Sequence, residues 1–428
     1  MMKSLQASPH SILSDIRKSV QSSVTVRTPV FAISLVVAAC GSSAGDDEPD
    51  DANILDVSSI DAAPFTDAVD APTDAQIWPP TDFGITVSAA AVADFDGDGR
   101  EDLLLAIDNG HRGLHVFRGG VDLDDHGAVI DAPDHAELLL GAVAALALYD
   151  GLAVIVHDGG PPTMAVFDTD LTLYSTSNGI PTFPPTDYVG LAPLPIGAQG
   201  SLGIATSTEL RYLERDELRL NPPTVTTLSQ PSSPFMDIRA FASDPSGTLV
   251  VAERSRVSLG APPAASGGAH TWTQRPLAGA PWANVIVGNV TNDARPDVIG
   301  YRKPAGGSAE ICVHDGADSP GVQPTCKVLT GQLAEFGLLL HAELDPSPGR
   351  DLIVAMARQG YFIDAYPDLH VDVAGVRSGP RRTLNLERWP DHLVTMDVDG
   401  DGDRELILIN QFGHIQCLAL TSAAFGSC

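Results

Sequence analysis

From residue 83 to its last residue, the chain alternates between short apolar runs and polar turns. The runs are rich in Val, Ile, Leu and Ala, and clusters of Gly, Pro, Asp and Asn separate them. Amphipathic stretches of helical length are almost absent. Short apolar runs bounded by turn residues are typical of β-strands, so the pattern predicts an all-β fold.

A repeated unit organises these strands. It consists of an apolar strand, an acidic or Gly/Pro-rich loop, a strand of the Asp-Leu-Leu-Leu-Ala type, a short turn and a third strand, and residues 90–119 hold its clearest copy. Further copies begin near Gly141, Tyr188, Met236, Trp282, Leu338 and His392. The starts are spaced by roughly 45 to 55 residues, which is the length of a four-stranded propeller blade. We therefore expect a β-propeller over residues 83–428 with seven blades of four antiparallel strands, six or eight blades being the alternatives.

The sequence allows two ways of closing this ring. A short strand near residues 423–428 would complete the last blade from within its own repeat. Alternatively, a segment near residues 76–86 would add an outer strand to that blade. Either arrangement leaves only short strand edges exposed.

Four of the five cysteines fall at matching places in two repeats. Cys312 lies in the third strand of its repeat and Cys326 in the expected fourth, and Cys417 and Cys428 occupy the same places in the last repeat. Neighbouring antiparallel strands can bring paired cysteines within disulfide reach, and exported proteins meet an oxidising compartment. We expect two bridges, each inside one blade; the alternative is that one or both pairs stay reduced.

Two loops carry carboxylates at alternate positions. Residues 94–102 have them at positions 1, 3, 5 and 9 with Gly at 4 and 6, and residues 397–405 repeat this arrangement. Alternate side chains of a curled loop point inward, where carboxylates and a backbone carbonyl can surround a structural calcium ion. A turn without metal is the alternative, although its carboxylates would repel each other. The candidate ligands are Asp94, Asp96, Asp98, the carbonyl of Arg100 and Asp102 in one loop, and Asp397, Asp399, Asp401, Asp403 and Glu405 in the other.

An EF-hand shares the first half of this pattern but requires an acidic twelfth residue, where this chain has Leu105 and Leu408. The loops instead resemble the calcium loops of FG-GAP and VCBS repeats, the family that includes the integrin α-subunit propeller. The resemblance implies a calcium loop between the first two strands of a blade. Two further repeats match the loop weakly, and their candidate ligands are Asn289, Thr291, Asp293 and Asp297 in one, and Glu343, Asp345 and Asp351 in the other.

The N-terminal segment has the features of an export signal. Basic residues precede a short apolar run over residues 29–39, which is too short for a permanent membrane-spanning helix. Residues 37–41, Val-Ala-Ala-Cys-Gly, resemble the lipobox of bacterial lipoproteins. The resemblance implies a signal peptide over residues 1–39, lipidation of Cys40 and, because Gly41 follows the cysteine, an outer-membrane or cell-surface location. An ordinary secretory signal cut nearby is the alternative.

Residues 40–82 are rich in Asp, Pro and Ala and contain no Lys or Arg. Such a composition repels itself and buries little surface, so we expect an extended tether between the membrane and the propeller. An acidic interaction tail is the alternative.

Charge and motifs narrow the function. The chain has 25 Lys and Arg against 55 Asp and Glu, for a net charge of -30, which opposes nucleic-acid binding. It lacks the His-Glu-x-x-His zinc motif, the phosphate-binding P-loop and the dinucleotide fingerprint. We therefore expect a recognition or adhesion module for a protein or carbohydrate ligand rather than an enzyme. A polysaccharide-acting enzyme such as a lyase and a scaffold of an outer-membrane assembly are the alternatives.

Overall fold

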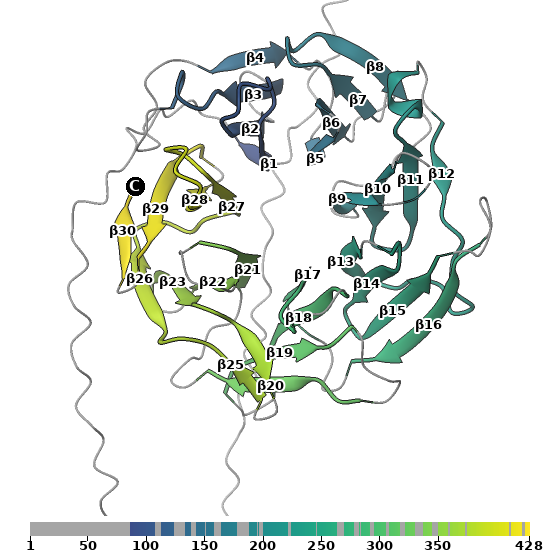
Figure 1. Cartoon of the computed structure of the whole chain (residues 1–428), viewed down its shortest axis with the longest axis vertical. Coiled ribbons are helices and arrows are strands. Elements are labelled where there is room, and N and C mark those ends of the chain that lie inside the picture. Colours follow the sequence, from purple (N-terminus) through teal and green to yellow (C-terminus); the bar gives the residue numbers. More distant parts are fainter. Residues whose placement is uncertain are drawn as a thin grey trace, which may run out of the picture. The chain divides into compact units, whose positions relative to one another are not determined.

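The chain folds into seven four-stranded antiparallel sheets arranged around a ring, as the computed structural model shows (Figure 1). The described residues are 86–428 without 108–112, 124–132, 138–142, 150, 158–163, 178–187, 195, 197–199, 221–223, 245, 263–268, 278–281, 283, 292–294, 305–307, 317–321, 330–336, 345–349, 358–359, 373–374, 411 and 422–423. In this part of the chain, no helix has the length and apolar character needed to cross a membrane. The expected seven-bladed propeller is confirmed.

Each blade is built from one continuous stretch of the chain, and in every blade but the sixth its four strands are consecutive. Blade 1 contains β1 (Val87–Ala93), β2 (Asp102–Ile107), β3 (Gly113–Phe117) and β4 (Asp134–Glu137), and blade 2 contains β5 (Val143–Tyr149), β6 (Leu152–His157), β7 (Met164–Phe167) and β8 (Leu173–Ser177). Blade 3 contains β9 (Tyr188–Leu194), β10 (Ser201–Thr206), β11 (Leu210–Glu214) and β12 (Thr226–Thr227), with the 3-10 turn η2 (Glu217–Arg219) before its last strand. Blade 4 contains β13 (Ile238–Ser243), β14 (Leu249–Glu253), β15 (Arg256–Ala261) and β16 (Thr271–Pro276).

The remaining blades follow the same plan. Blade 5 contains β17 (Asn284–Gly288), β18 (Asp297–Arg302), β19 (Glu310–His314) and β20 (Thr325–Val328). Blade 6 contains β21 (Gly337–Ala342), β22 (Asp351–Ala357), β23 (Tyr361–Tyr366) and β26 (Arg382–Leu386), with the hairpin β24 (His370–Asp372) and β25 (Gly375–Arg377) inserted before β26. Blade 7 contains β27 (His392–Met396), β28 (Glu405–Ile409), β29 (Ile415–Leu420) and β30 (Phe425–Ser427). The first strand of every blade begins within three residues of the start expected from the repeat.

The hydrophobic cores lie between the blades. All six residues of β2 are buried, although a strand with one solvent face would alternate. Leu103 and Leu105 pack into a core shared with blade 7, whereas Leu104 and Ala106 pack into a core shared with blade 2. Because successive side chains of a strand point to opposite faces, a continuous apolar run is what a strand between two neighbouring blades requires.

The ring closes by packing between the first and last blades. Strand β1 contacts both β5 and β27, and the same succession of inner strands continues around the ring (Figure 1). Strand β30 pairs with β29, so the last blade is completed by its own C-terminal strand. Of the two closures that the sequence allowed, the structure has the first. No strand of blade 1 is exchanged with blade 7 among the described residues, so side-chain contacts hold this seam together.

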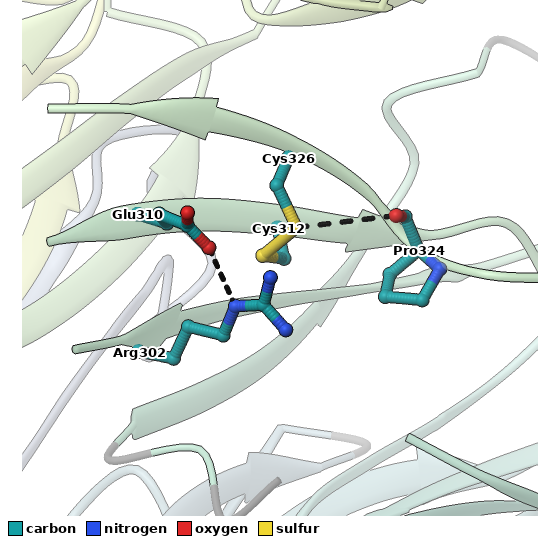
Figure 2. Close-up of a disulfide and its surroundings, with 5 residues drawn as sticks. All are labelled: Arg302, Glu310, Cys312, Pro324 and Cys326. Carbon is teal, nitrogen blue, oxygen red and sulfur yellow. Dashed lines mark hydrogen bonds and ion pairs between the residues drawn. A yellow bond between two sulfur atoms is a disulfide. The ribbon is translucent and has the colours of Figure 1, made fainter. Parts of the chain in front are cut away.

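Both expected disulfides are present, one between the last two strands of blade 5 and the other between β29 and the residue that follows β30. Cys312 on β19 stands directly opposite Cys326 on β20, with a Cα–Cα distance of 4.0 Å. Figure 2 shows this bridge beside the ion pair between Arg302 and Glu310. Cys417 on β29 is bonded to Cys428, with a Cα–Cα distance of 5.7 Å. Each bridge fastens an outer strand to its blade.

Candidate functional site

The first candidate loop, residues 94–102, joins β1 to β2, and we call it loop A. Asp94 accepts hydrogen bonds from the backbone N–H groups of Gly97 and Gly99, at 2.7 and 3.1 Å. These two glycines have φ values of 79° and 93°, a left-handed conformation that residues with a Cβ rarely adopt. Asp96 and Asp98 each accept the N–H group two residues further along, at 3.1 and 2.8 Å. The loop is therefore curled around its own carboxylates.

The second candidate loop, residues 397–405, joins β27 to β28, and we call it loop B. Asp397 accepts the N–H groups of Gly400 and Gly402 at 2.8 and 3.2 Å, and their φ values are 75° and 95°. Asp399 and Asp401 each accept the N–H group two residues further along, at 3.1 and 2.8 Å. Two loops about 300 positions apart thus repeat each other bond for bond, as the sequence pattern predicted.

Three carboxylates converge in each loop. One oxygen from each lies within 4.8 Å of the others, and the sets are Asp94, Asp96 and Asp102 in loop A, and Asp397, Asp399 and Glu405 in loop B. Asp98, Asp401 and Asp403 are not in these sets, and the carboxylates of Asp98 and Asp401 accept backbone N–H groups of their own loops. Metal binding by the predicted ligands, including the carbonyl of Arg100, stays a prediction.

The ninth-position carboxylate also holds the backbone of its blade, a role that the loop spacing does not predict. Asp102 is fully buried and accepts the N–H group of Phe95 at 2.9 Å and that of Gly119 at 3.0 Å. It therefore ties the start of loop A to the chain leaving β3. A Cβ on Gly119 would collide with the carbonyl oxygen of Glu101, so this close approach requires glycine.

We call this arrangement, in which the ninth-position carboxylate accepts N–H groups from the start of its loop and from the chain after the third strand, the carboxylate clip. It recurs in blades 5 and 6. Asp297 accepts the N–H groups of Val290 and Gly316 at 2.7 and 3.1 Å. In blade 6, Asp351 accepts the N–H groups of Leu344 and Asp368, both at 3.1 Å. Both aspartates are fully buried. The acidic ninth position is thus used in four blades, including two whose loops, as far as they are described, bring no three metal-ligating side chains together.

Glu405 differs from these aspartates in having a free oxygen. Its Oε2 atom accepts the N–H group of Val398 at 3.0 Å, and in the described part of the chain Oε1 has no hydrogen-bond donor. Only 8% of Glu405 is exposed. Burial raises the pKa of Glu405, and repulsion from Asp399, Asp401 and Asp397 raises it further, to about 7, against the lowering effect of the Val398 N–H group. A cation would favour the charged form of this carboxylate.

The pKa of Asp102, the ninth residue of loop A, is also raised. Burial raises the pKa of Asp102 and the charge of Asp96 adds to the rise, while the N–H groups of Gly119 and Phe95 lower it. The donor set in both loops consists of hard carboxylate oxygens, which suits calcium rather than zinc or copper.

A contact across the ring seam joins the two loops. Glu101, at the eighth position of loop A, accepts the N–H group of Asp397 at 2.8 Å. Its other oxygen pairs with Arg404, at the eighth position of loop B, and Arg404 also donates to the Thr395 hydroxyl at 3.1 Å. Glu101 therefore links the first ligand position of loop B to loop A. It lies inside the recognised motif, but no local signal marks a contact spanning 296 positions.

An arginine from outside loop A contacts one of the carboxylates of that loop. Arg118 follows β3, and its Nη1 atom lies 2.9 Å from Oδ2 of Asp96. The same guanidinium donates to Asp134 at 3.1 Å and to the carbonyl of Thr169 in blade 2 at 3.0 Å. No local sequence signal marks this residue, because it stands 22 positions from Asp96.

The two weaker loops are described in part. Thr291 donates its hydroxyl to Asp297, at 3.1 and 3.2 Å from the two oxygens. Glu343 is exposed at the start of its loop. Asp293 and Asp345 lie outside the described residues, and metal binding in these loops, including any by Asn289 and Asp351, stays a prediction.

The loop between the first two strands of blade 4 lacks the alternating carboxylates of loops A and B. In blade 4, the carboxylate of Asp244 accepts the N–H group of Thr248 at 2.8 Å and its backbone carbonyl accepts that of Gly247 at 3.0 Å, so this loop forms a turn. The expected signal peptide over residues 1–39, the lipidated Cys40 and the tether over residues 40–82 lie outside the described residues.

Comparisons with known proteins support the fold. No protein-family model matches the chain, and no curated protein sequence matches it. Among solved structures, the chain is similar to a chain in the crystal structure of BBS1N in complex with ARL6DN, soaked with mercury, at 13% identity and a TM-score of 0.51, covering 79% of this chain and 93% of that one. The crystal of the same complex soaked with lead gives 13% identity and a TM-score of 0.49, covering 78% and 91%. At this identity, the likeness concerns the propeller fold alone.

Proposed function

We propose that this protein is an exported, lipid-anchored β-propeller that binds calcium and acts as a recognition or adhesion module for a protein or carbohydrate ligand. The observation that carries the proposal is the pair of loops A and B, which meet at the ring seam with converging carboxylates and one set of internal hydrogen bonds.

Calcium would be held by Asp94, Asp96 and Asp102 in loop A, and by their counterparts in loop B. It would supply positive charge where the buried ninth-position carboxylate and the more exposed carboxylates of the first and third positions repel one another. The protein's own contribution is a curled backbone that holds these side chains in place through N–H groups. The role of calcium would be structural, because each loop connects the first two strands of its own blade, and these two blades close the ring.

The calcium part of this proposal is tested by titrating the full chain with calcium in a calorimeter. We expect two sites with Kd values of about 10⁻⁴ to 10⁻³ M, as in extracellular modules. The double variant Asp96→Ala, Asp399→Ala should give no binding heat, whereas Asp170→Asn, in an exposed turn, should bind as the unaltered protein does. Absence of heat in the unaltered chain would contradict the proposal.

The anchor is tested through Cys40. Detergent-phase partitioning of the full chain expressed in a bacterium should place it with membranes, and mass spectrometry should find a diacylglyceryl group on Cys40. The Cys40→Ser variant should move to the soluble fraction. An unmodified Cys40 in a processed chain would support the ordinary secretory signal instead.

The ligand proposal draws on the fold. Propellers present loops from every blade around one mouth, and in the similar crystal structure BBS1N is in a complex with another protein, ARL6DN. The test is a calcium-dependent binding screen of the full chain against glycan arrays and immobilised surface proteins, with a chelator as control. Retention of a defined ligand supports recognition, whereas release of unsaturated sugar products from a polysaccharide would favour a lyase.

A further inference from the structure

We propose that the two loops differ in calcium affinity, loop B being the tight site and loop A the weak one, and that Arg118 sets the difference. This inference rests on the proposed calcium binding and adds the order in which the loops fill.

Arg118 is a fixed cation in loop A. Its side chain is only 16% exposed, and three acceptors hold its guanidinium: Asp96 at 2.9 Å, Asp134 at 3.1 Å and the Thr169 carbonyl at 3.0 Å. Because two of these acceptors lie outside loop A, the guanidinium keeps its place whether or not Asp96 turns away. A calcium ion entering loop A therefore meets a positive charge already bound to one ligand oxygen.

Loop B has no such cation on its third position. Asp399 is the counterpart of Asp96, and in the described part of the chain its Oδ2 atom has neither a hydrogen-bond donor nor an ion-pair partner. The strand register explains the difference: Leu103 pairs with Phe117, the residue before Arg118, and Leu406 pairs with Leu418, the residue before Ala419. An alanine thus stands in blade 7 where blade 1 has the arginine.

The loop sequences add to the asymmetry. At the odd-numbered positions, which supply the predicted ligands, loop B is acidic at all five, whereas loop A is acidic at four and has Arg100 where loop B has Asp403. The eighth positions, Glu101 and Arg404, pair with each other. Glu405 adds a buried oxygen without a donor, whereas both oxygens of Asp102 accept N–H groups. The affinity of calcium loops follows ligand charge and site rigidity, and every one of these differences favours loop B.

The experiment measures each loop alone in the full chain. Calcium titration calorimetry of Asp96→Ala reports loop B, and that of Asp399→Ala reports loop A. We expect the Kd of loop B to be at least tenfold lower. Adding Arg118→Gln to Asp399→Ala should tighten loop A at least fivefold, whereas adding it to Asp96→Ala should leave loop B unchanged.

Two controls separate the charge of Arg118 from its packing. Arg118→Lys keeps the charge and should leave the affinity of loop A near its original value. Arg302→Gln breaks a comparable ion pair with Glu310, at 2.7 Å in blade 5, and should change neither loop. Thermal unfolding in chelator establishes that each variant is folded.

The outcomes are distinct. Equal affinities, or a tighter loop A, overturn the inference, and so does an Arg118→Gln change that leaves loop A unaltered. If Arg118→Gln does not fold, the order of the two single-loop variants decides. Absence of calcium binding in the unaltered chain refutes the proposed calcium function itself, which is a different result.

Discussion

Replacing Asp297 by Asn tests whether the buried ninth-position carboxylate holds a blade together without metal. Asp297 is fully buried, and its Oδ2 accepts the N–H groups of Val290 and Thr291 at 2.7 and 2.9 Å. Its Oδ1 accepts the N–H group of Gly316 at 3.1 Å. An asparagine can keep an oxygen on only one side, so its amide group would face at least one N–H donor.

The magnitude follows from these bonds. A buried N–H group left without an acceptor costs about 1–3 kcal/mol, and two bonds that change from charged to neutral acceptors lose about 1 kcal/mol each. Burial raises the pKa of Asp297, so removing its charge recovers part of this loss. We expect a net destabilisation of about 3 kcal/mol, which lowers Tm by about 4 °C in a folded body of this size.

Thermal unfolding of the full chain, followed by circular dichroism with calcium and with chelator, measures the effect. Asp170→Asn, in an exposed turn, is the matched control and should shift Tm by less than about 1 °C. We expect the same Asp297→Asn shift in both conditions. A Tm within about 1 °C of the unaltered protein would refute the clip, and a shift seen only with calcium would instead assign a metal to blade 5.

Three further predictions concern the blade bridges, the seam and pH. Replacing Cys312 and Cys326 by Ser removes a cross-link between residues 14 positions apart and should cost about 3 kcal/mol in urea unfolding. Glu101→Gln weakens the pair with Arg404 and should cost about 1–2 kcal/mol and speed proteolytic removal of the last blade. Burial lowers the pKa of His341 to about 4, and the charge of Arg350 adds to the effect. His341 therefore binds a proton more weakly in the folded than in the unfolded state. The stability that its neutral form contributes is complete above the unfolded pKa of 6.5, and about 3 kcal/mol of it is lost as pH falls toward 4. The urea midpoint of His341→Gln should therefore change less with pH than that of the unaltered protein.

The blades and the two acidic loops could be predicted because they depend on residues that are close together in the sequence. The apolar run after Asp102 signals a strand buried on both faces, and the Asp and Gly spacing of loops A and B specifies a turn whose hydrogen bonds lie within seven residues. The cysteine pairs were predictable because the repeat places them on neighbouring strands. These features depend on short-range periodicity and turn geometry, which a sequence displays directly.

The contacts that distinguish the two loops could not be read from the sequence. Glu101 reaches Asp397 because the ring closes and brings the first and last blades together, and Arg118 reaches Asp96 only because β3 returns beside loop A. The clip between Asp102 and Gly119 likewise depends on how the third strand leaves the blade. Such contacts follow from tertiary placement, and the residue types alone fit many other partners.

Thermal unfolding of the full chain with calcium and with chelator decides whether loops A and B hold structural metal. At a calcium concentration ten times the Kd of loop A, that site adds about 1.4 kcal/mol and loop B, with a tenfold lower Kd, adds about 2.7 kcal/mol. Together the two sites should raise Tm of the full chain by about 6 °C over the value in chelator. The rise should disappear in Asp96→Ala, Asp399→Ala and persist in Asp170→Asn. An equal Tm with calcium and with chelator in the unaltered chain would contradict the account and leave loops A and B as acidic turns held by their own backbone.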